Sequence, residues 1–486
     1  MNPLIKKLAG QTAVYGLSSI VGRLLNYLLV PYYTRLFLPD EYGVITEIYS
    51  YTGIAIIMLT YGLETGYFRF ATNNKDESSL YQSLLTSLAL SGLIFVSIIF
   101  VFQSSINTGI GLPSDNYFVL IMALTVSFDA FLALPFARLR HLSKAFHFAS
   151  FKLFGILLNI GLNVLFYETD LGEYLGLSTY FSGVGYVFLS NFVSTILTLV
   201  AMLSYIELFR KFDFKLLRTV LQYSYPILFL GLAGMVNESG DKILLKYILG
   251  YTGDFSDKQI MHELGIYGAN YKIAIFMMLF IQAFRFAADP FFFKNSGGAN
   301  NKTLYASVMH YFVFTGGLVF LGIITFMHFI KGFISSSYHE GLAIVPILLV
   351  AKWVYGIVFS MSFWYKLTDR TIYGLYITLV GSAVTLIGSL LVIPYFGYVG
   401  LSYVILASYS AMAGLSYYYG QKYFPVPYNK RLIIVLVIVP IILYMLINYL
   451  SVNTLDFILP GIISMIAYVG FAYYINKNWN ARKHES

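Results

Sequence analysis

Apolar segments long enough to cross a membrane follow one another along the whole chain, with short polar connections between them. They lie near residues 8–36, 43–70, 80–104, 114–138, 145–167, 182–208, 217–249, 264–293, 303–330, 341–365, 371–393, 398–421, 431–450 and 456–476. A helix of about 20 residues covers a hydrocarbon layer of ~30 Å. The pattern therefore predicts an all-α integral membrane protein with about fourteen transmembrane helices and no soluble domain on either face.

The composition agrees with a membrane protein. Of 486 residues, 58% are hydrophobic and only 11% are charged, whereas a soluble domain carries roughly 25% charged residues. The 43 tyrosines and 42 phenylalanines exceed what two interfacial belts need, so we expect some of them to line an internal surface. The absence of cysteine excludes disulfides and thiolate metal sites.

The basic residues indicate the orientation in the membrane. If the N-terminus is inside, 21 of the 31 lysines and arginines lie on the cytoplasmic side, and only Arg35, Lys246, Lys258 and Lys331 lie on the other. This distribution follows the positive-inside rule. It predicts a multi-pass protein of the bacterial cytoplasmic membrane with both termini in the cytoplasm. It also accounts for the net charge of +8 without a nucleic-acid partner.

A short phrase recurs in the two halves of the chain. EYGVITEIY, residues 41–49, and ELGIYGANY, residues 263–271, share their Glu, Gly and Tyr positions at an offset of 222 residues. Six helices separate the copies, so both insert in the same direction, and such parallel repeats place a substrate cavity between the halves. We expect six-helix lobes at 1–211 and 212–425, related by a pseudo-two-fold axis normal to the membrane, and an extra helix pair at 426–486. Chance recurrence in tyrosine-rich helices is the alternative.

Charged residues inside the predicted helices are the candidates for function. They are Arg23, Glu64, Asp129, Lys152, Glu238, Asp241, Lys242, Lys272, Arg285, Asp289 and Lys352. Each would cost at least ~2.5–3.5 kcal/mol facing lipid at mid-depth. We therefore expect them to face protein, a partner or water.

Some of these charges have candidate partners nearby in sequence. In NESGDK, residues 237–242, Glu238 and Lys242 are four residues apart, which suits either a cation or gating site or a self-satisfied ion pair. Arg285 and Asp289 have the same spacing near the cytoplasmic end. Asp129 and Lys152 could form a structural bridge between two helices, whereas Arg23 has no acid within four residues.

Other chemistry is missing from the sequence. There is no GxxxxGK[ST] phosphate loop, and the seven histidines have no metal-ligand spacing. The outer loops reach only about a dozen residues, which is short for a membrane glycosyltransferase, so we expect no enzyme. The last two predicted helices carry no charge from 432 to 455 and from 457 to 476. They could face lipid on all sides or border a groove for a lipid chain.

The stretch KLAGQTAVYGLSSIVGRLLNYLLVPYYTRLFLPDEYGVITEIYS, residues 7–50, resembles the start of Wzx-type polysaccharide flippases. The shared features are a polar first turn, an arginine in the first helix, a P-x-x-TR tail and an acid-x-x-G start to the second helix. Together with the recurrence at residue 263 and the expected helix count, they place the whole chain near the superfamily of MATE exporters, lipid II flippases and O-antigen flippases.

The resemblance implies two six-helix lobes with alternating access. It implies flipping of undecaprenyl-diphosphate-linked oligosaccharide from the cytoplasmic to the outer leaflet, for surface polysaccharide biosynthesis. Arg23 would bind the diphosphate by its position, and Lys272, Arg285 and Lys352 by analogy of helix. The coupling or gating candidates are Glu64, Glu238, Asp241, Lys242 and Asp289, and no cofactor is expected beyond a coupling proton or sodium ion.

Two other functions stay open at this point. A cation-coupled multidrug exporter of the MATE type would use Glu238, Asp241 and Asp289 as ligands, and a membrane-embedded polymerase or ligase would alter product length. The residues also leave open whether the product is O-antigen of lipopolysaccharide, capsule, exopolysaccharide or a glycoprotein glycan. The expected partners are the lipid-linked oligosaccharide, membrane lipids, and the polymerase and glycosyltransferases of the same pathway.

Overall fold

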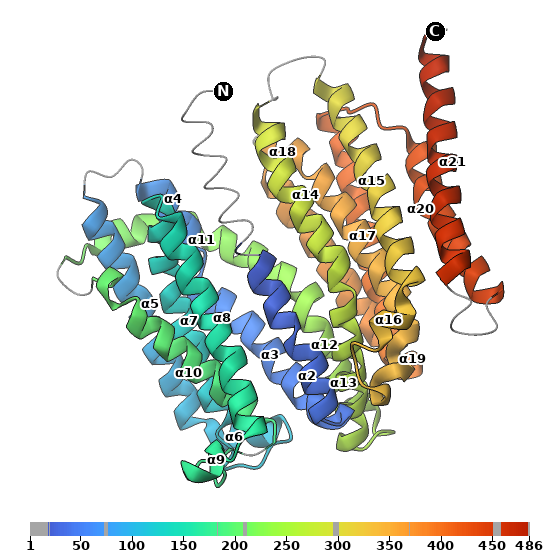
Figure 1. The fold of residues 1–486 in the computed structure, drawn as a ribbon. Coiled ribbons are helices and arrows are strands. Elements are labelled where there is room, and N and C mark those ends of the chain that lie inside the picture. The colour runs from blue at the N-terminus through green and yellow to red at the C-terminus, as the bar shows by residue number, and fades with distance from the viewer. Residues whose placement is uncertain are drawn as a thin grey trace. The chain divides into compact units, whose positions relative to one another are not determined.

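The computed structural model describes residues 18, 20–71, 76–181, 183–207, 211–294, 301–368, 370–450 and 458–484, and all regular structure in these ranges is helical (Figure 1). The expected all-α membrane class is confirmed. Two compact units, unit 1 (Met1–Gly265) and unit 2 (Ile266–Ser486), meet within one helix. The lobes at 1–211 and 212–425 follow from the sequence repeat instead, and that division stays a prediction.

Unit 1 begins with a helical segment at residues 20–27. Its further elements include five helices of more than twenty residues and one short stretch of π-helix. They are α2 (Leu29–Leu36), α3 (Pro39–Thr60), α4 (Leu63–Ala71), α5 (Glu77–Val101), α6 (Gln103–Gly109), α7 (Phe118–His141), α8 (Ala145–Glu168), α9 (Leu171–Tyr174), α10 (Gly185–Ala201), the 3-10 turn η1 (Leu203–Tyr205), α11 (Phe214–Met235), the π-helix η2 (Val236–Gly240), α12 (Asp241–Thr252) and the first half of α13 (Asp257–Ile273).

Local sequence signals set several of these helix ends. Asp76 and Asp213 cap α5 and α11, because their carboxylates accept the backbone N–H of the residue three positions on, at 3.1 and 3.0 Å. Tyr61 and Gly62 have positive φ of 31° and 74° and separate α3 from α4.

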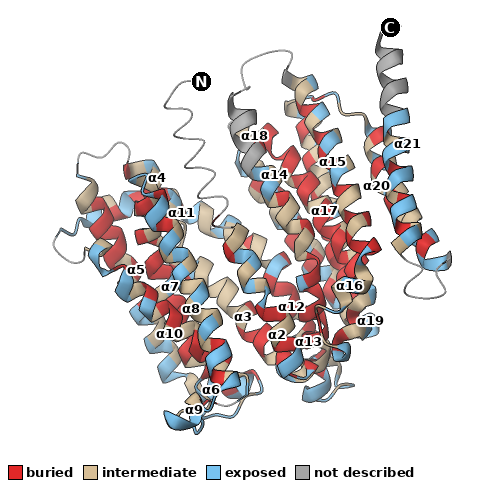
Figure 2. Cartoon of the chain, in the orientation of Figure 1, coloured by how far each residue is buried: buried red, intermediate tan, exposed pale blue. Residues whose placement is uncertain are grey.

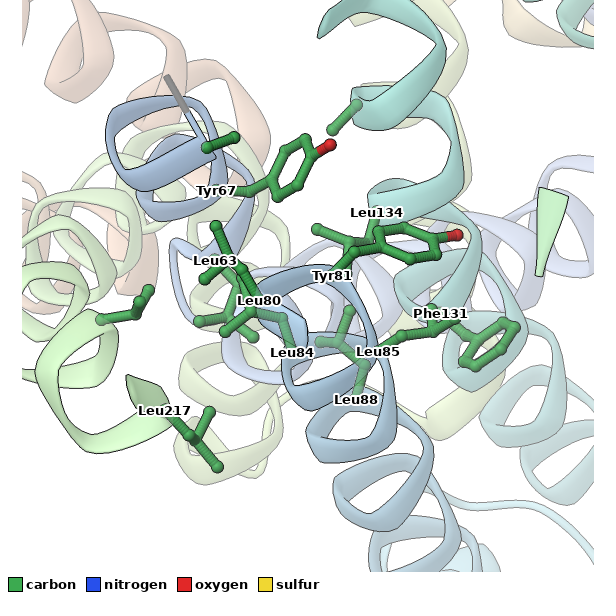
Figure 3. Close-up of a cluster of buried hydrophobic side chains, with 13 residues drawn as sticks. Leu63, Tyr67, Leu80, Tyr81, Leu84, Leu85, Leu88, Phe131, Leu134 and Leu217 are labelled. Carbon is green, nitrogen blue, oxygen red and sulfur yellow. The ribbon is translucent and has the colours of Figure 1, made fainter. Parts of the chain in front are cut away.

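The interior of unit 1 is a cluster of leucines and aromatic rings from α4, α5, α7 and α11. Figure 3 shows Leu63 and Tyr67 of α4 facing Tyr81 and the leucines of α5, with Leu134 of α7 and Leu217 of α11 beside them. Tyr67 and Tyr81 have no exposed surface. This packing joins the neighbouring helices α4 and α5 to α7 and α11, which are more distant in sequence.

The two glycines of the sequence repeat lie at one close helix crossing in unit 1. A Cβ on Gly43 of α3 would lie 2.8 Å from the carbonyl carbon of Met261 in α13. A Cβ on Gly265 of α13 would lie 2.8 Å from the carbonyl carbon of Pro39 and 3.0 Å from the backbone nitrogen of Gly43. Pro39 and Met261 are themselves 222 residues apart, so the contact is reciprocal between the repeat copies. Only glycine allows backbones this close.

Unit 2 comprises the rest of α13 and eight further α-helices, with α17 at its centre. They are α14 (Ile275–Lys294), α15 (Asn301–Thr325), α16 (Met327–Lys331), the 3-10 helix η3 (Ser336–Ile344), α17 (Val345–Met361), α18 (Phe363–Leu367), α19 (Ile372–Tyr423), α20 (Lys430–Leu450) and α21 (Ile458–His484). Figure 2 shows α17 almost wholly buried among its neighbours α14, α15 and α19.

Two adjacent glycines of α15 contact aromatic rings from two different helices, α17 and α21. A side chain on Gly316 would collide with the indole of Trp353 in α17, and one on Gly317 would lie 2.8 Å from the ring carbon Cζ of Tyr468 in α21. Tyr468 also donates to the carbonyl of Leu436 in α20 at 2.9 Å. The last helix pair is thus packed on α15 on one side, so the suggestion that it faces lipid all round is wrong.

Nine helices in the described ranges are long and apolar enough to cross a membrane, and a tenth if α13 and α14, bent by 41°, make one span. The 52 residues of α19 cover two predicted spans, joined at Gly397 with φ 52° and ψ −139°. Two more predicted spans correspond to shorter apolar helices, Gly185–Ala201 and Ile458–Tyr474. The chain is therefore a multi-pass membrane protein, and the count of fourteen stays a prediction.

Candidate functional site

Arg23 is exposed on the helical segment at residues 20–27. Arg23, Asn26 and Tyr27 share one face of this segment because they are three and four residues apart. The side of the segment that carries Gly22, next to Asn26, packs on α8, where a Cβ on Gly22 would meet Ile156 at 2.7 Å. No carboxylate in the described part of the chain forms an ion pair with Arg23. The guanidinium is therefore accessible to an anion.

Glu238 is an acid within electrostatic range of this face. Both Arg23 and Glu238 act electrostatically on the hydroxyl of Tyr27, so both charges lie within electrostatic range of that tyrosine. The carboxylate of Glu238 is exposed. An exposed cation and an exposed acid of unit 1 thus both lie within electrostatic range of one tyrosine hydroxyl.

The segment NESGDK does not form the ion pair that its spacing suggested. The Nζ of Lys242 donates to the carboxylate of Asp241 at 3.0 Å and to the backbone carbonyl of Glu238 at 2.7 Å. The reason is the π-helix η2, in which hydrogen bonds join residues five apart, so residues four apart no longer share a face. Asp241 and Lys242 are buried, and single-turn π-bulges are common at functional sites.

Glu64 takes an arginine from another helix. It pairs with Arg140 of α7, whose guanidinium also lies over the ring of Phe68 at 5.1 Å. Arg69, in the last turn of the same helix as Glu64, stacks on Tyr223 at 4.6 Å instead. Glu64 thus joins α4 to α7 at one end of unit 1.

A second network at this end was not foreseen. Arg138 of α7 contacts Glu77 at 3.3 Å and Glu207 at 2.8 Å and lies over the ring of Tyr81. The hydrogen bond from Arg138 holds the pKa of the Glu207 carboxyl below its usual value. We infer that these charges fix the ends of α5, α7 and α10.

The buried pair of Glu47 and Lys246 was also missed by the sequence analysis. The Nζ of Lys246 lies 2.6 Å from Glu47 Oε1 and 2.7 Å from the carbonyl of Ile110. Beside this pair, Tyr51, one turn after Glu47 in α3, donates to Tyr247 of α12 at 2.9 Å. The sequence analysis placed Lys246 on the outer side of the membrane, and the available signal for its partner was Glu47, an acid within the apolar segment 43–70.

Asp129 and Lys152 share a cavity but do not form the expected bridge. No ion pair within 4 Å joins them in the described residues; Asp129 accepts the hydroxyl of Thr195 at 3.2 Å, and Lys152 Nζ lies 5.3 Å from the ring centre of Phe136. Both side chains are exposed although they belong to helices of spanning length.

In unit 2 the three predicted cations have different surroundings. Lys272 is exposed, and Arg285 is exposed with its guanidinium 4.2 Å from the ring centre of Phe359. Lys352 is only 3% exposed, donates to the hydroxyl of Tyr271 and lies 5.6 Å from the ring centre of Tyr409. A ligand reaches Lys352 only if this aromatic packing opens. The side chain of Asp289 lies outside the described residues.

Comparison with solved structures gives close matches in fold. The lipid II flippase MurJ in an inward closed conformation matches with a TM-score of 0.69 at 13% identity, over 95% of this chain and 98% of that one. An inward-facing multidrug resistance MATE family transporter of the MOP superfamily matches at 0.64 and 12% identity, over 82% and 94%. A MOP superfamily transporter from Pyrococcus furiosus matches at 0.56 and 13% identity, over 88% and 96%.

Comparison of the sequence gives one family match. No curated protein matches the chain. A family model described as polysaccharide biosynthesis protein matches residues 8–296, which covers Arg23, the π-helix and both copies of the repeat. The chain therefore belongs to the polysaccharide biosynthesis protein family, on the helical fold that MurJ and the MATE transporters share.

Proposed function

We propose that this protein flips undecaprenyl-diphosphate-linked oligosaccharide from the cytoplasmic to the outer leaflet of the bacterial inner membrane, by alternating access and without enzymatic chemistry. The family assignment supports a role in polysaccharide biosynthesis, and the fold supports membrane transport. With both termini in the cytoplasm, the basic ends of the helices face the leaflet in which the substrate is assembled.

The observation that carries the proposal is the exposure of Arg23 within a membrane-embedded segment. An arginine facing lipid at mid-depth is costly, so an exposed one indicates a polar cavity or a bound anion. A guanidinium presents a planar fork of donors that matches two phosphate oxygens and keeps its charge in a site of low dielectric. A lipid diphosphate has the matching charge and geometry.

The direct test replaces Arg23. Arg23→Ala removes both charge and donors, so we expect loss of surface polysaccharide and accumulation of the lipid-linked oligosaccharide. Arg23→Lys retains the charge without the fork and keeps part of the export. Arg69→Ala is the matched control, because it removes an exposed arginine that stacks on Tyr223.

The readouts are surface polysaccharide by immunoblot, lipid-linked intermediate by mass spectrometry, and protein level in the membrane. Normal export by Arg23→Ala at wild-type protein level would refute the proposal. Increased drug susceptibility of the deletion strain, with normal polysaccharide, would favour a multidrug exporter instead.

Coupling to a proton or sodium gradient is part of the proposal. Glu238 is its best candidate, because its carboxylate is exposed beside the π-helix while Asp241 is buried against Lys242. Glu238→Gln should lower export at a fixed protein level and weaken its response to a collapsed proton or sodium gradient. An unchanged response would assign the coupling to another group.

A further inference from the structure

A polar cavity of about 170 Å³ lies entirely within unit 1. The segment at residues 20–27 contributes Asn26, α7 contributes Asp129, α8 contributes Lys152 and Asn159, and α10 contributes Asn191 and Thr195. At roughly 30 Å³ for each water, this volume holds about five or six waters, or one sugar ring. It accounts for two intramembrane charges that the proposed diphosphate contacts do not use.

Small residues hold the helices around this cavity at a fixed distance. A Cβ on Gly155 of α8 would lie 2.6 Å from the hydroxyl of Thr198 in α10, and one on Gly22 would lie 2.7 Å from Ile156. The helices therefore touch beside the cavity rather than collapsing into it. The cavity is a built feature of the helix packing.

The cavity lining contains one acid, Asp129, and one base, Lys152, so it has no net charge. This balance favours a neutral ligand. An anion drawn to Lys152 would meet the carboxylate of Asp129, and a cation drawn to Asp129 would meet the ammonium of Lys152. A neutral molecule that both donates and accepts hydrogen bonds satisfies both groups. Asn26 and Asn159 each add an amide group with a donor and an acceptor. Asn159 Oδ1 already accepts from Asn163 at 3.0 Å, and Asn191 already uses one donor on Tyr49 at 3.1 Å.

Two aromatic rings complete the surface. Phe136 of α7 and Phe151 of α8 line the same cavity. Sugar rings have apolar C–H faces and a rim of hydroxyls, so they suit a pocket that combines ring faces with amides, a carboxylate and an ammonium. The lining thus matches a neutral sugar better than an ion or a hydrocarbon chain.

The cavity also lies next to the proposed diphosphate contact. Asn26 follows Arg23 by three residues on the same face, a rise of ~4.5 Å along a helix. In a lipid-linked oligosaccharide the first sugar is bonded directly to the diphosphate. Resting on the proposed function, we propose that this cavity binds one neutral sugar residue of the substrate while Arg23 holds the diphosphate.

The absence of cysteine from the chain makes a labelling test clean. Three single-cysteine variants of the full chain are purified and reconstituted: Asn159→Cys in the cavity, Leu24→Cys beside Arg23, and Phe146→Cys, a control on α8 that is 78% exposed. Each is labelled with a charged maleimide. The probes are undecaprenyl diphosphate without sugar, and lipid-linked oligosaccharide extracted from the deletion strain.

We expect the oligosaccharide lipid to slow labelling of Asn159→Cys at least tenfold and the sugar-free lipid to leave it unchanged. Both lipids should slow labelling of Leu24→Cys, and neither should affect Phe146→Cys. Protection of Leu24→Cys without protection of Asn159→Cys would overturn the sugar subsite and leave the proposed function standing. Failure of both lipids to protect Leu24→Cys would count against the proposed function itself, and equal protection of Asn159→Cys by both lipids would show that the cavity does not recognise sugar.

Discussion

The reciprocal crossing of Gly43 and Gly265 yields the sharpest stability prediction. Replacing either glycine with alanine directs a methyl group at the backbone of the other helix, 2.8 Å from a carbonyl carbon and closer still to its oxygen. Ordinary contact requires roughly 3.5–4.0 Å. Neither backbone can rotate away as a flexible side chain would, so α3 and α13 must separate by about 1 Å.

The magnitude follows from two opposing terms. Overpacking of this kind costs about 1–3 kcal/mol and sometimes more, while alanine in a helix gains about 0.8–1.0 kcal/mol over glycine. At Gly161 of α8 a Cβ would have no heavy atom within 4 Å. Gly161→Ala should therefore have the gain in helix propensity without the cost of overpacking. Gly265→Ala and Gly161→Ala should therefore differ by roughly 1–3 kcal/mol.

The assay measures the thermal stability of the purified chain in detergent. After heating to a series of temperatures, the fraction of monodisperse protein is measured by size-exclusion chromatography. Gly43→Ala and Gly265→Ala should each lower the midpoint, and Gly161→Ala should hold or raise it. The double variant should be less destabilised than the sum, because one methyl group already separates the helices. Equal melting midpoints for Gly265→Ala and Gly161→Ala would refute the close approach of α3 and α13 at these glycines.

Three further predictions test other parts of the structure. Asp241→Asn should destabilise the protein by about 3–5 kcal/mol because it leaves Lys242 buried without its counter-ion, and adding Lys242→Met should restore thermal stability in part; no restoration would contradict the pairing. The hydrogen bond from Arg138 lowers the pKa of the Glu207 carboxyl in the folded protein. The stabilisation from this bond is therefore present above the pKa of the unfolded state and is lost as the pH falls through the pKa of the folded state. The difference in melting midpoint between wild type and Glu207→Gln should become smaller from pH 6 to pH 4. Gly397→Ala should cost about 1–3 kcal/mol because φ 52° and ψ −139° suit glycine alone, and an unchanged melting midpoint would contradict the break in α19.

Hydropathy predicted the membrane class and the positions of most helices because lipid requires long apolar segments. Local sequence could not predict the partners of the charges, since most of them are distant in the chain. Glu47 and Lys246 are 199 residues apart, and Glu64 and Arg140 are 76 apart. Spacing rules examine only the next helical turn, so they could not identify either partner.

The π-helix shows a second limit of sequence reasoning. A spacing of four residues predicted that Glu238 would face Lys242, but that rule assumes 3.6 residues per turn. One wider turn redirects Lys242 to Asp241 and exposes Glu238. Nothing in VNESG besides its polarity and its glycine indicates such a turn, and the packing of Gly53 of α3 against Ser239 is visible only in three dimensions.

The repeat illustrates the opposite case, in which a weak sequence signal had a physical cause. The matched glycines are needed because each helix requires the other's backbone at close range. The matched tyrosines have comparable tasks, since Tyr49 accepts Asn191 of α10 in unit 1 and Tyr271 accepts Lys352 of α17 in unit 2. Each repeat copy thus combines one residue for close approach with a hydroxyl, six residues later, that holds a polar group inside its own unit. The matches at the glycine and tyrosine positions of this nine-residue phrase therefore have a physical cause, because backbone approach and hydroxyl contacts restrict the residues that fit there.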